Sequence, residues 1–460
     1  MRYVSTRGAS PELGFTDVLL AGLAPDGGLY VPAEWPNLPE RAPGVGYAER
    51  AAQIIDLFVD GDLPSSTVRR LCEEAYSTFA HPAVVPLVQI DERHFVHELF
   101  HGPTLAFKDV ALQLVGRLFD EVLRARGQRV TIVGATSGDT GSAAIDGVKG
   151  CANVDIVILY PDGRTSDVQR RQMTTVDSPN VRVVAVDGTF DDCQDLVKAM
   201  FADTAFRDGV GLSAVNSINW ARVMAQIVYY AVAADTMRGP VDVCVPSGNF
   251  GNVFAGWIAR RMGADIGRLV VASNANDILT RFFRSNDMSA RGVVPSLSPS
   301  MDIQVSSNFE RLLFEMNGRD GAATAEQLQR FRASGLLAVE PEQRARFIDD
   351  VFLAGRLDDA ETLEVIRSVH AESGYLLDPH TAVGVGVVRA LQAEGELGRT
   401  TVTMGTAHPA KFPDAVERAT GVRPGLPPHL ADLFDREEHL TRLPNDLATI
   451  QEFVRGAFGR

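Results

Sequence analysis

The chain has 460 residues, which is too long for one ordinary hydrophobic core, so we expect two or three packed units. Its composition, with 45% hydrophobic and 22% charged residues, is that of a soluble globular protein. The 44 lysine and arginine residues against 59 aspartate and glutamate residues give a net charge of −15, which repels nucleic acid and anionic membranes, so we expect neither as a partner.

The N-terminal part of the chain has a helical pattern. Residues 46–80 carry two amphipathic helical stretches, which are separated by chain breakers between Gly61 and Ser66. We therefore predict an N-terminal domain over residues 1–85 that is mostly helical.

The middle of the chain alternates between two patterns. From residue 130 to 275, apolar β-rich runs such as VTIVGA, VDIVILY and VDVCVP alternate with helical stretches. Strands without polar alternation are buried on both faces, and strand–helix alternation indicates a mainly parallel sheet with right-handed crossovers. The predicted fold class is therefore α/β.

The last third of the chain begins with an irregular stretch. Residues 286–309 are rich in Ser, Pro and Gly and are predicted to form a long ordered loop. Helical patterns continue to residue 397, and the strand TVTMGTA then leads into another helix.

Four cysteines lie far apart and form no C-x-x-C pair. This spacing argues against a disulfide framework and against a thiolate zinc site. The first 15 residues have no apolar core of signal-peptide length, and no stretch approaches the roughly 18 apolar residues of a membrane span. We therefore expect reduced thiols and a cytoplasmic protein.

Two loops that follow predicted strands and open helices are candidate binding sites. SGNFGN, Ser247–Asn252, has two glycines that let a ligand approach the backbone, and it begins a helix whose N–H groups attract a phosphate. An ordinary strand-to-helix turn is the alternative. TSGDTG, Thr136–Gly141, gathers hydroxyl and N–H donors that suit a carboxylate, with Asp139 expected to cap the helix.

Lys108 lies at the start of a predicted helix, where a cation is disfavoured. Gly102 and Pro103 break the chain, Thr104 can cap, and apolar periodicity begins at Phe107. The helix dipole and an apolar edge both lower the pKa of an amine, which makes it a better nucleophile toward a carbonyl. The alternative is a lysine whose stem covers apolar surface while its charge reaches water.

The stretch HELFH, residues 97–101, matches the zinc-protease pattern H-E-x-x-H, with His94 nearby. The pattern works only in a continuous helix, where positions i and i+4 share a face. A Gly-Pro pair follows at once, and the surrounding sequence is typical of a strand. We expect no metal and keep a remote alternative, a zinc metallopeptidase at His97, Glu98 and His101.

Six motifs occur in order along the chain. They are FHGPTLAFKD (100–109), GATSGDTGSAA (134–144), NSINWAR (216–222), PSGNFGN (246–252), SPSMDIQVSSNFERLLF (298–314) and GTAHPAKF (405–412). Together they resemble the threonine synthases, which are pyridoxal-phosphate enzymes of the tryptophan-synthase β fold type. The opening MRYVSTRG and DGGLYVP resemble the longer bacterial and fungal subgroup, which has an extra N-terminal domain.

The resemblance implies the domain organisation and the cofactor. The fold would be the two-domain fold type II with mainly parallel sheets. Residues 86–460 would form the catalytic region, with a smaller α/β subdomain at about 110–215 and a larger one formed by the remainder. The cofactor would be pyridoxal 5′-phosphate, and the protein would be a monomer or a homodimer.

The resemblance also implies cofactor-binding residues. Lys108 matches the lysine that holds the cofactor covalently and serves as the catalytic base. The loop around the cofactor phosphate matches Gly248, Asn249, Phe250 and Asn252. Thr406 matches the hydroxyl residue beside the pyridine nitrogen, which makes the ring a milder electron sink than an aspartate would.

Two further segments match substrate-binding elements. The element that takes the substrate carboxylate matches Thr136, Ser137, Gly138, Asp139 and Thr140. The residues that hold the substrate phosphate match Asn216, Ser217 and Arg222. A guanidinium can grip two phosphate oxygens and supplies the local positive charge that an anionic ligand needs in an acidic protein. A surface salt bridge is the alternative for this arginine.

The implied reaction converts O-phospho-L-homoserine and water to L-threonine and phosphate, by γ-elimination and addition of water at Cβ. A phospho-lyase that releases 2-oxobutyrate, ammonia and phosphate from the same substrate is the nearest alternative. The motifs around the cofactor do not separate these two outcomes.

Overall fold

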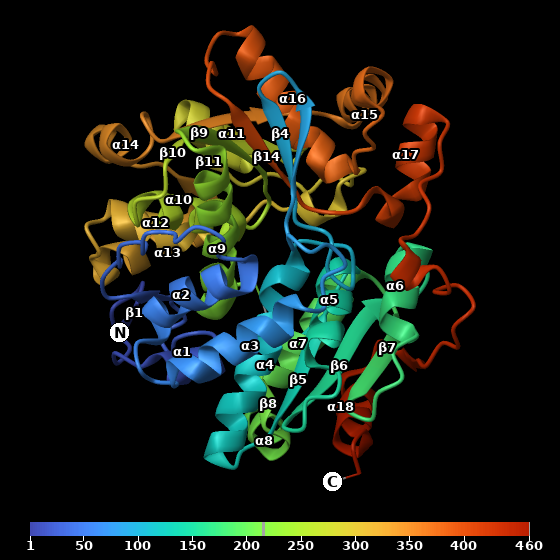
Figure 1. The fold of residues 1–460 in the computed structure, drawn as a ribbon. Helices are drawn as coiled ribbons and strands as arrows, with labels where there is room; N and C mark the ends of the chain where they lie inside the picture. The colour runs from blue at the N-terminus through green and yellow to red at the C-terminus, as the bar shows by residue number, and fades with distance from the viewer. Residues whose placement is uncertain (214–216, 460) are drawn as a thin grey trace. The chain divides into compact units, whose positions relative to one another are not determined.

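The computed structural model describes residues 1–213 and 217–459, and the chain forms two compact units (Figure 1). The first unit consists of Met1–Cys72, His81–Phe100 and Ser217–Pro424. The second unit consists of Glu73–Ala80, His101–Asn216 and Gly425–Arg460.

The second unit is built on a five-stranded sheet in the order β15-β7-β6-β5-β8. All its strand pairs are parallel. The strands are β5 (Val130–Ala135), β6 (Val154–Pro161), β7 (Val181–Asp187), β8 (Leu212–Ser213) and β15 (Thr441–Pro444). Every residue of β6 is buried, because this central strand lies between two neighbours and under helices on both faces.

Helices from distant parts of the chain cover one face of this sheet. They are α7 (Phe190–Ala202), α8 (Thr204–Val210) and α18 (Leu447–Gly456). Their apolar side chains share one core with the sheet, which includes Val157, Val184, Met200, Phe206 and Ile450. The C-terminal segment thus completes the second unit.

The remaining helices of this unit are α4 (Lys108–Arg126), α5 (Asp139–Val148) and α6 (Asp167–Thr174). Helices α4 and α5 approach closely through two glycines. A Cβ on Gly116 would lie 2.0 Å from the carbonyl oxygen of Gly147, and a Cβ on Gly147 would lie 2.5 Å from that of Leu112. The start of α4 consequently lies beside the start of α5, with Lys108 next to Asp139.

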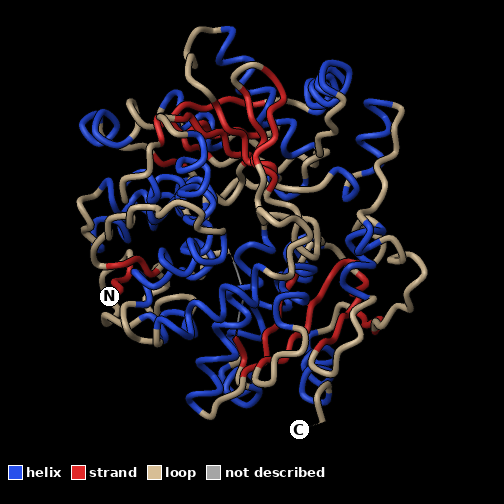
Figure 2. Tube along the Cα trace, viewed as in Figure 1, coloured by secondary structure: helices blue, strands red, loops and turns tan. Residues whose placement is uncertain are grey.

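The first unit is built on a six-stranded sheet in the order β13-β10-β9-β14-β4-β3, and Figure 2 draws the strands in red. The strands are β3 (Leu87–Asp91), β4 (His94–Glu98), β9 (Val241–Pro246), β10 (Ile266–Ser273), β13 (Phe352–Arg356) and β14 (Thr401–Gly405). Only the β3–β4 pair is antiparallel among these strands. Because β10, β9 and β14 are parallel neighbours, the loops after them meet at one edge of the sheet.

Helices cover both faces of the six-stranded sheet. They are α9 (Trp220–Met237), α10 (Gly251–Arg261), α11 (Ile278–Ser285), α15 (Asp359–Ser373), α16 (Pro379–Ala393) and α17 (Pro413–Thr420). Helix α16 packs its valines on β9 and β10, in a core with Cys244, Val270, Val383 and Val387.

The N-terminal segment belongs to the first unit. It contains β1 (Tyr3–Ser5), α1 (Phe15–Ala21), β2 (Tyr30–Pro32), α2 (Tyr47–Val59) and α3 (Ser65–Tyr76), the last of which continues into the second unit. Helix α2 packs on α9, where Arg50 donates to Asp235 at 3.0 Å. The predicted N-terminal domain over residues 1–85 stays a prediction.

Shorter elements complete the first unit. They are β11 (Met288–Ser289), α12 (Phe309–Met316), α13 (Gly321–Ser334), β12 (Leu336–Leu337), α14 (Pro341–Phe347) and the 3-10 turns Pro299–Met301 and Pro409–Lys411. The second unit has one further 3-10 turn, Pro428–Leu430. The stretch 286–309 is mainly loop, as predicted.

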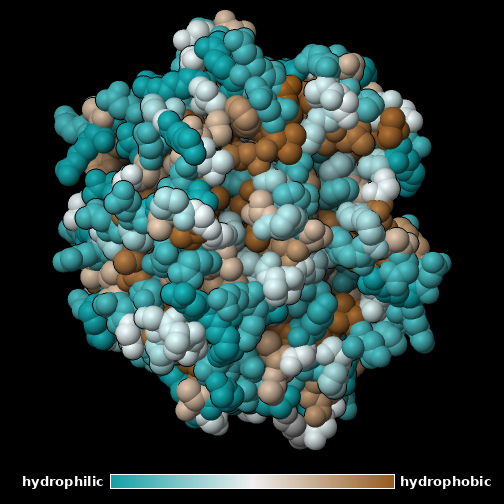
Figure 3. Space-filling model, in the orientation of Figure 1, coloured by the Kyte–Doolittle hydropathy of each residue, from teal (hydrophilic) through white to brown (hydrophobic). Residues whose placement is uncertain are grey.

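The surface agrees with the composition. Figure 3 shows hydrophilic side chains over most of the visible face, with hydrophobic side chains in small groups between them. Among residues 1–213 and 217–459, no helix is both long enough and apolar enough to cross a membrane. The four cysteines, all of them described, are free thiols.

Candidate active site

Lys108 is the first residue of α4 and is 9% exposed. Its Nζ atom donates to Asp139 Oδ2 at 3.1 Å and lies 5.5 Å from the centroid of the Phe107 ring. The predicted capping role of Thr104 is wrong, because its N–H and hydroxyl both donate to the Asp109 carboxylate, at 2.8 and 2.6 Å. The two hydrogen bonds between Thr104 and Asp109 therefore hold the first turn of α4, in which Lys108 is the first residue.

Asp139 does not cap α5, contrary to the sequence prediction. The helix begins at Asp139 itself, after Gly138 with φ 142°, and has no side-chain cap. One carboxylate oxygen accepts from Lys108 and the other accepts from Gln169 Nε2 at 2.9 Å. The reason is geometric: the two carboxylate oxygens bond side chains of other helices, Lys108 of α4 and Gln169 of α6.

The TSGDTG loop is held in shape by Thr136. Its hydroxyl accepts from the N–H groups of Gly138, at 3.0 Å, and of Gly141, at 2.9 Å. A Cβ on Gly138 would lie 2.5 Å from the side-chain carbon of Gln169, so only glycine fits. Ser137 is exposed and Thr140 is half-buried, which leaves their hydroxyls and the first turn of α5 as donors for a carboxylate.

The SGNFGN loop joins β9 to α10 in the first unit and forms a narrow turn. Phe250 has φ 62°, a left-handed conformation that is unusual for a bulky residue, and its ring is buried against Phe283 and Phe309. A Cβ on Gly248 would lie 2.9 Å from Ile303. Burial of the phenyl ring thus stabilises the strained turn that opens α10.

Asn252, in the first turn of α10, has a buried side-chain amide that is only partly hydrogen-bonded. Its Oδ1 atom contacts the hydroxyls of Tyr229 and Tyr230, at 2.6 and 2.7 Å. Burial raises the pKa of both tyrosines well above the ordinary value, so both remain protonated donors. The Nδ2 atom is buried and has no acceptor among the described residues, so the amide can donate to an added anion.

Thr406 follows β14 and lies at the same sheet edge as SGNFGN. Its N–H donates to the Thr381 hydroxyl at 3.2 Å, and that hydroxyl donates to Asp378. The Thr406 hydroxyl is buried, and the part of the chain that the structure describes supplies no partner for it. A ligand atom such as a ring nitrogen would satisfy it.

Arg222, near the start of α9, is 3% exposed. Its Nε and Nη1 atoms have no acceptor within residues 1–213 and 217–459, and burial lowers the pKa of this guanidinium to about 10. The group is therefore still a cation at neutral pH, and the alternative of a surface salt bridge does not hold. A buried cation whose N–H groups lack acceptors calls for an anionic ligand.

Two other predicted residues neighbour this arginine in sequence. Ser217 is half-buried, and its carbonyl oxygen accepts from Asn308 Nδ2 at 3.1 Å. Asn216 lies outside the described residues.

These donors fit pyridoxal phosphate and a second anion. The unsatisfied Asn252 amide at a helix N-terminus suits a phosphate, the Thr406 hydroxyl suits a pyridine nitrogen, and the Lys108 amine suits an aldehyde. Arg222 remains for a further anionic group. The Asn252 amide, the Thr406 hydroxyl and the Arg222 guanidinium belong to the first unit, and the Lys108 amine belongs to the second unit.

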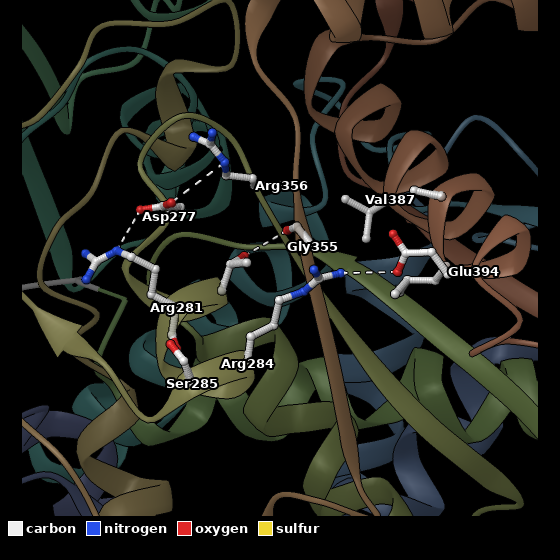
Figure 4. Close-up of a pocket in the computed structure, with 11 residues that line it drawn as sticks. Asp277, Arg281, Arg284, Ser285, Gly355, Arg356, Val387 and Glu394 are labelled. Atoms are coloured by element: carbon white, nitrogen blue, oxygen red, sulfur yellow. Dashed lines mark hydrogen bonds and ion pairs between the residues drawn. The ribbon is translucent and has the colours of Figure 1, made fainter.

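A separate cavity of about 360 Å³ in the first unit is also rich in arginine (Figure 4). There Arg281 pairs with Asp277 at 2.9 Å, Arg356 pairs with Asp277 at 3.8 Å, and Arg284 pairs with Glu394 at 3.7 Å. Because each guanidinium already has a carboxylate, this cavity is a weaker candidate for an anion than Arg222.

The zinc-peptidase alternative fails on geometry. Residues His94–Glu98 form strand β4, so no helical face carries the H-E-x-x-H pattern. The His97 ring bonds the Val85 carbonyl at 2.9 Å, and Glu98 accepts from the Tyr375 hydroxyl at 2.6 Å. Within the described ranges, no cluster of three or more potential ligands could hold a metal.

Several residues around these groups were not predicted from the sequence. They are Gln169, Tyr229, Tyr230, Asn308, Thr381 and Asp378. Asn308 lies in the motif 298–314, which was a signal without an assigned role. The others had no sequence signal. Gln169, Tyr229, Tyr230 and Thr381 act through contacts with residues at least 22 positions away, and Asp378 acts through the neighbouring Thr381.

Comparisons with known proteins agree with this geometry. Three family models match: "Threonine synthase N terminus" at residues 2–76, "Pyridoxal-phosphate dependent enzyme" at 82–342 and "Threonine synthase, C-terminal" at 381–454. The threonine synthase of Pseudomonas aeruginosa is 56% identical over an alignment of 462 residues, gaps included, that covers 99% of this chain and 98% of that protein.

Solved structures give the same result. The pyridoxal-phosphate-bound threonine synthase of Brucella melitensis has a TM-score of 0.96 and 51% identity, with full coverage of both chains. The yeast threonine synthase has a TM-score of 0.94 and 38% identity, and covers 99% of this chain and 98% of that one. The predicted α/β fold and the predicted cofactor, pyridoxal phosphate, are confirmed, and the chain is a pyridoxal-phosphate-dependent lyase. The chain belongs to the threonine synthase family.

Proposed function

We propose that this protein converts O-phospho-L-homoserine and water to L-threonine and inorganic phosphate, the last step of threonine biosynthesis. The observation that carries the proposal is the buried guanidinium of Arg222, whose Nε and Nη1 atoms lack acceptors among the described residues. A substrate with a phosphate supplies the missing anion. Family membership supports the same reaction.

Lys108 is proposed to hold the cofactor and then to move protons. When bound, pyridoxal phosphate supplies an electron sink for negative charge at the substrate carbons. The released Lys108 amine would take the proton from Cα and pass it on before it removes one from Cβ. It would later return protons to Cγ and Cα as phosphate leaves and water adds at Cβ. Asp139, at 3.1 Å from Nζ, orients this amine.

The other residues are proposed to bind and orient. The cofactor phosphate would be held by Gly248, Asn249, Phe250 and Asn252. The substrate carboxylate would be held by hydroxyl and backbone N–H donors of Thr136, Ser137, Gly138, Asp139 and Thr140. The substrate phosphate would be held by Asn216, Ser217 and Arg222. Thr406 would contact the pyridine nitrogen as a neutral partner, because a hydroxyl does not carry the charge of a carboxylate.

The phospho-lyase alternative is not favoured, since full-length relatives at 41–56% identity are threonine synthases. A product balance tests the choice. Purified holoenzyme receives O-phospho-L-homoserine, and threonine, 2-oxobutyrate and phosphate are quantified together. We expect threonine equal to phosphate. Equal amounts of 2-oxobutyrate and phosphate would establish the lyase. If no phosphate is released, the proposed substrate is wrong.

The negative control in this assay is Lys108→Ala. Without the amine there is no group to hold the cofactor covalently and none to move the Cα proton, so turnover should be abolished. Activity like that of the parent protein would contradict the role of Lys108.

We also propose the finer features of the protein. It is expected to be cytoplasmic, to be a monomer or homodimer, and to have no nucleic-acid or membrane partner. Its fold is expected to be type II, with the N-terminal domain at 1–85 and the smaller subdomain at about 110–215. Sedimentation of the holoenzyme would measure the oligomeric state.

A further inference from the structure

Asn308 lies in the motif 298–314, to which the proposed function gives no role. It is fully buried and immediately precedes α12. Its backbone N–H, its side-chain amide nitrogen and its side-chain oxygen all form hydrogen bonds, each to a different part of the first unit. An asparagine with all these groups engaged is a structural junction.

One side of this junction holds the loop proposed for the cofactor phosphate. The Asn308 N–H donates to the Asn249 carbonyl oxygen at 3.2 Å. Two residues earlier, the Ser306 hydroxyl donates to the Gly248 carbonyl oxygen at 2.5 Å. A Cβ on Gly251 would lie 3.1 Å from Asn308 Nδ2, so the loop and the asparagine are in close contact.

The other side holds the segment proposed for the substrate phosphate. Asn308 Nδ2 donates to the Ser217 carbonyl oxygen at 3.1 Å. The segment continues into the N-cap Asn219, whose side chain accepts from the Ala221 N–H at 3.0 Å, and then into Arg222. The path from Ser217 to Arg222 is therefore anchored at the Asn308 amide.

Arg311 fixes the orientation of that amide. Its Nη1 atom donates to Asn308 Oδ1, so Nδ2 is the atom that faces Ser217. The same guanidinium donates to the carbonyl oxygens of Tyr30, at 3.0 Å, and of Ile218, at 2.6 Å. Because carbonyl and amide oxygens engage this arginine, it serves the framework, whereas Arg222 has atoms left for a ligand.

We propose that Asn308 is a positioning residue that sets the spacing between the two phosphate sites. The inference rests on the proposed function, which places one phosphate at SGNFGN and the other at Arg222. Two phosphates repel each other, and a neutral amide ties their binding segments together without adding charge. The side chain reaches the substrate-phosphate segment, while the backbone N–H reaches the cofactor loop.

Because the Asn308 side chain contacts one segment and its backbone contacts the other, two variants should each weaken a different affinity. Asn308→Ala removes the bond to Ser217 but keeps the backbone bond to Asn249. It should weaken binding of inorganic phosphate to the holoenzyme about fivefold to tenfold, raise KM for the substrate more than it lowers kcat, and change cofactor affinity less than twofold. Ser306→Ala removes the bond to Gly248 and should weaken cofactor affinity by a similar factor, with phosphate affinity retained.

The measurements are calorimetric titration of holoenzyme with inorganic phosphate and fluorescence titration of apoenzyme with pyridoxal phosphate. The matched control is Asn180→Ala in the second unit. Asn180 is also buried, and its amide bridges the carbonyl oxygens of Val148 and Val154 at 2.9 and 2.7 Å. This variant should lower the melting temperature and leave both affinities unchanged.

Equal loss of both affinities in Asn308→Ala, or phosphate affinity like that of the parent protein, would overturn the inference. If Asn308→Ala does not fold, Asn308→Asp keeps the contact with Arg311 and replaces the donor that faces Ser217 by an oxygen. It should bind phosphate at least as weakly, and unchanged binding in this variant also overturns the inference. A parent holoenzyme that binds no inorganic phosphate overturns it as well.

The two proposals fail separately. If Asn308→Ala weakens phosphate binding while the parent protein releases no phosphate from O-phospho-L-homoserine, the proposed substrate is wrong and the role of Asn308 stands. If the parent protein forms threonine and Asn308→Ala binds phosphate normally, only the role of Asn308 is wrong.

Discussion

A buried arginine normally has a carboxylate partner, and the first unit allows a direct comparison. Arg50 is 2% exposed and donates to Asp235 at 3.0 Å and to the Pro39 carbonyl oxygen at 2.7 Å. Arg222 is equally buried, but its Nε and Nη1 atoms have no acceptor in the described part of the chain. One residue stabilises the fold, and the other keeps an uncompensated charge that a ligand can neutralise.

Replacing each arginine separates these roles. Arg222→Ala removes a buried charge, so the free energy of unfolding of the ligand-free protein should stay the same or rise. The same change should raise KM for O-phospho-L-homoserine about tenfold to a hundredfold, because a charge-assisted contact with the phosphate is lost. Urea unfolding in phosphate-free buffer and steady-state kinetics measure the two effects.

Arg50→Ala is the matched control for Arg222→Ala. It should lower the free energy of unfolding by about 3 kcal/mol, since Asp235 is left without its partner, and it should leave KM unchanged. If Arg222→Ala instead destabilised the protein and left KM unchanged, Arg222 would be a structural residue.

At the scale of elements, the position of the Lys108 amine depends on how two helices pack. Gly116 and Gly147 let α4 and α5 approach so closely that their backbones touch. Lys108 precedes Gly116 by the same number of residues as Asp139 precedes Gly147. The helices therefore run in the same direction, and the glycine contact sets the distance between the lysine and its carboxylate.

Gly116→Ala should disturb that distance. The added Cβ would lie 2.0 Å from the Gly147 carbonyl oxygen, so α4 and α5 must separate. We expect a loss of about 1–3 kcal/mol in the free energy of unfolding, as in other overpacked cores, together with a lower kcat. Urea unfolding and turnover of the purified variant measure both effects.

Gly209→Ala provides the control for helix propensity. Gly209 lies in α8, and a Cβ there meets nothing within 4 Å. This change should raise the free energy of unfolding by about 0.4–1 kcal/mol and leave kcat unchanged. Similar behaviour of the two alanine variants would contradict the role of the glycine contact.

The elements also indicate what the sequence can predict. The predicted strands VTIVGA and VDVCVP are β5 and β9, and one of the helical stretches predicted between them is α9, because apolar periodicity is a local property. Strand pairing is not local. No pattern at Thr441–Pro444 indicated that this C-terminal segment adds β15 beside β7, or that the strands belong to two sheets.

The same limit applies to the candidate site. Lys108 and Arg222 were identified from their motifs, and the structure buries both. The capping roles of Thr104 and Asp139 were wrong. Both residues lie close in sequence to a helix start, which suggested a cap, but in the fold Thr104 bonds Asp109, and Asp139 bonds Lys108 and Gln169. Residues that act through long-range contacts, such as Asn308, can be recognised only once the chain is folded.

At the scale of the whole molecule, the interior of the first unit contains two histidines that must remain neutral. His94 and His97 lie on β4, inside the six-stranded sheet, and both are fully buried. Burial lowers the pKa of each from 6.5 to about 4. The rings bond neutral groups, the Thr403 hydroxyl and the Val85 carbonyl, although Asp91 approaches His94 at 3.8 Å and Arg389 opposes its protonation.

These histidines make stability depend on pH in a defined window. Between about pH 6.5 and 4 the unfolded chain binds protons at both histidines and the folded chain does not, so the free energy of unfolding falls as the pH is lowered. Each histidine should account for about 2 kcal/mol of the loss between pH 7.5 and 5. Urea unfolding of apoenzyme at the two pH values should show this decrease, and His94→Gln combined with His97→Gln should reduce it. The exposed His439→Gln should keep the dependence of the parent protein. Parallel losses in the parent protein and the double variant would mean that other groups, such as carboxylates, cause the acid sensitivity of the fold.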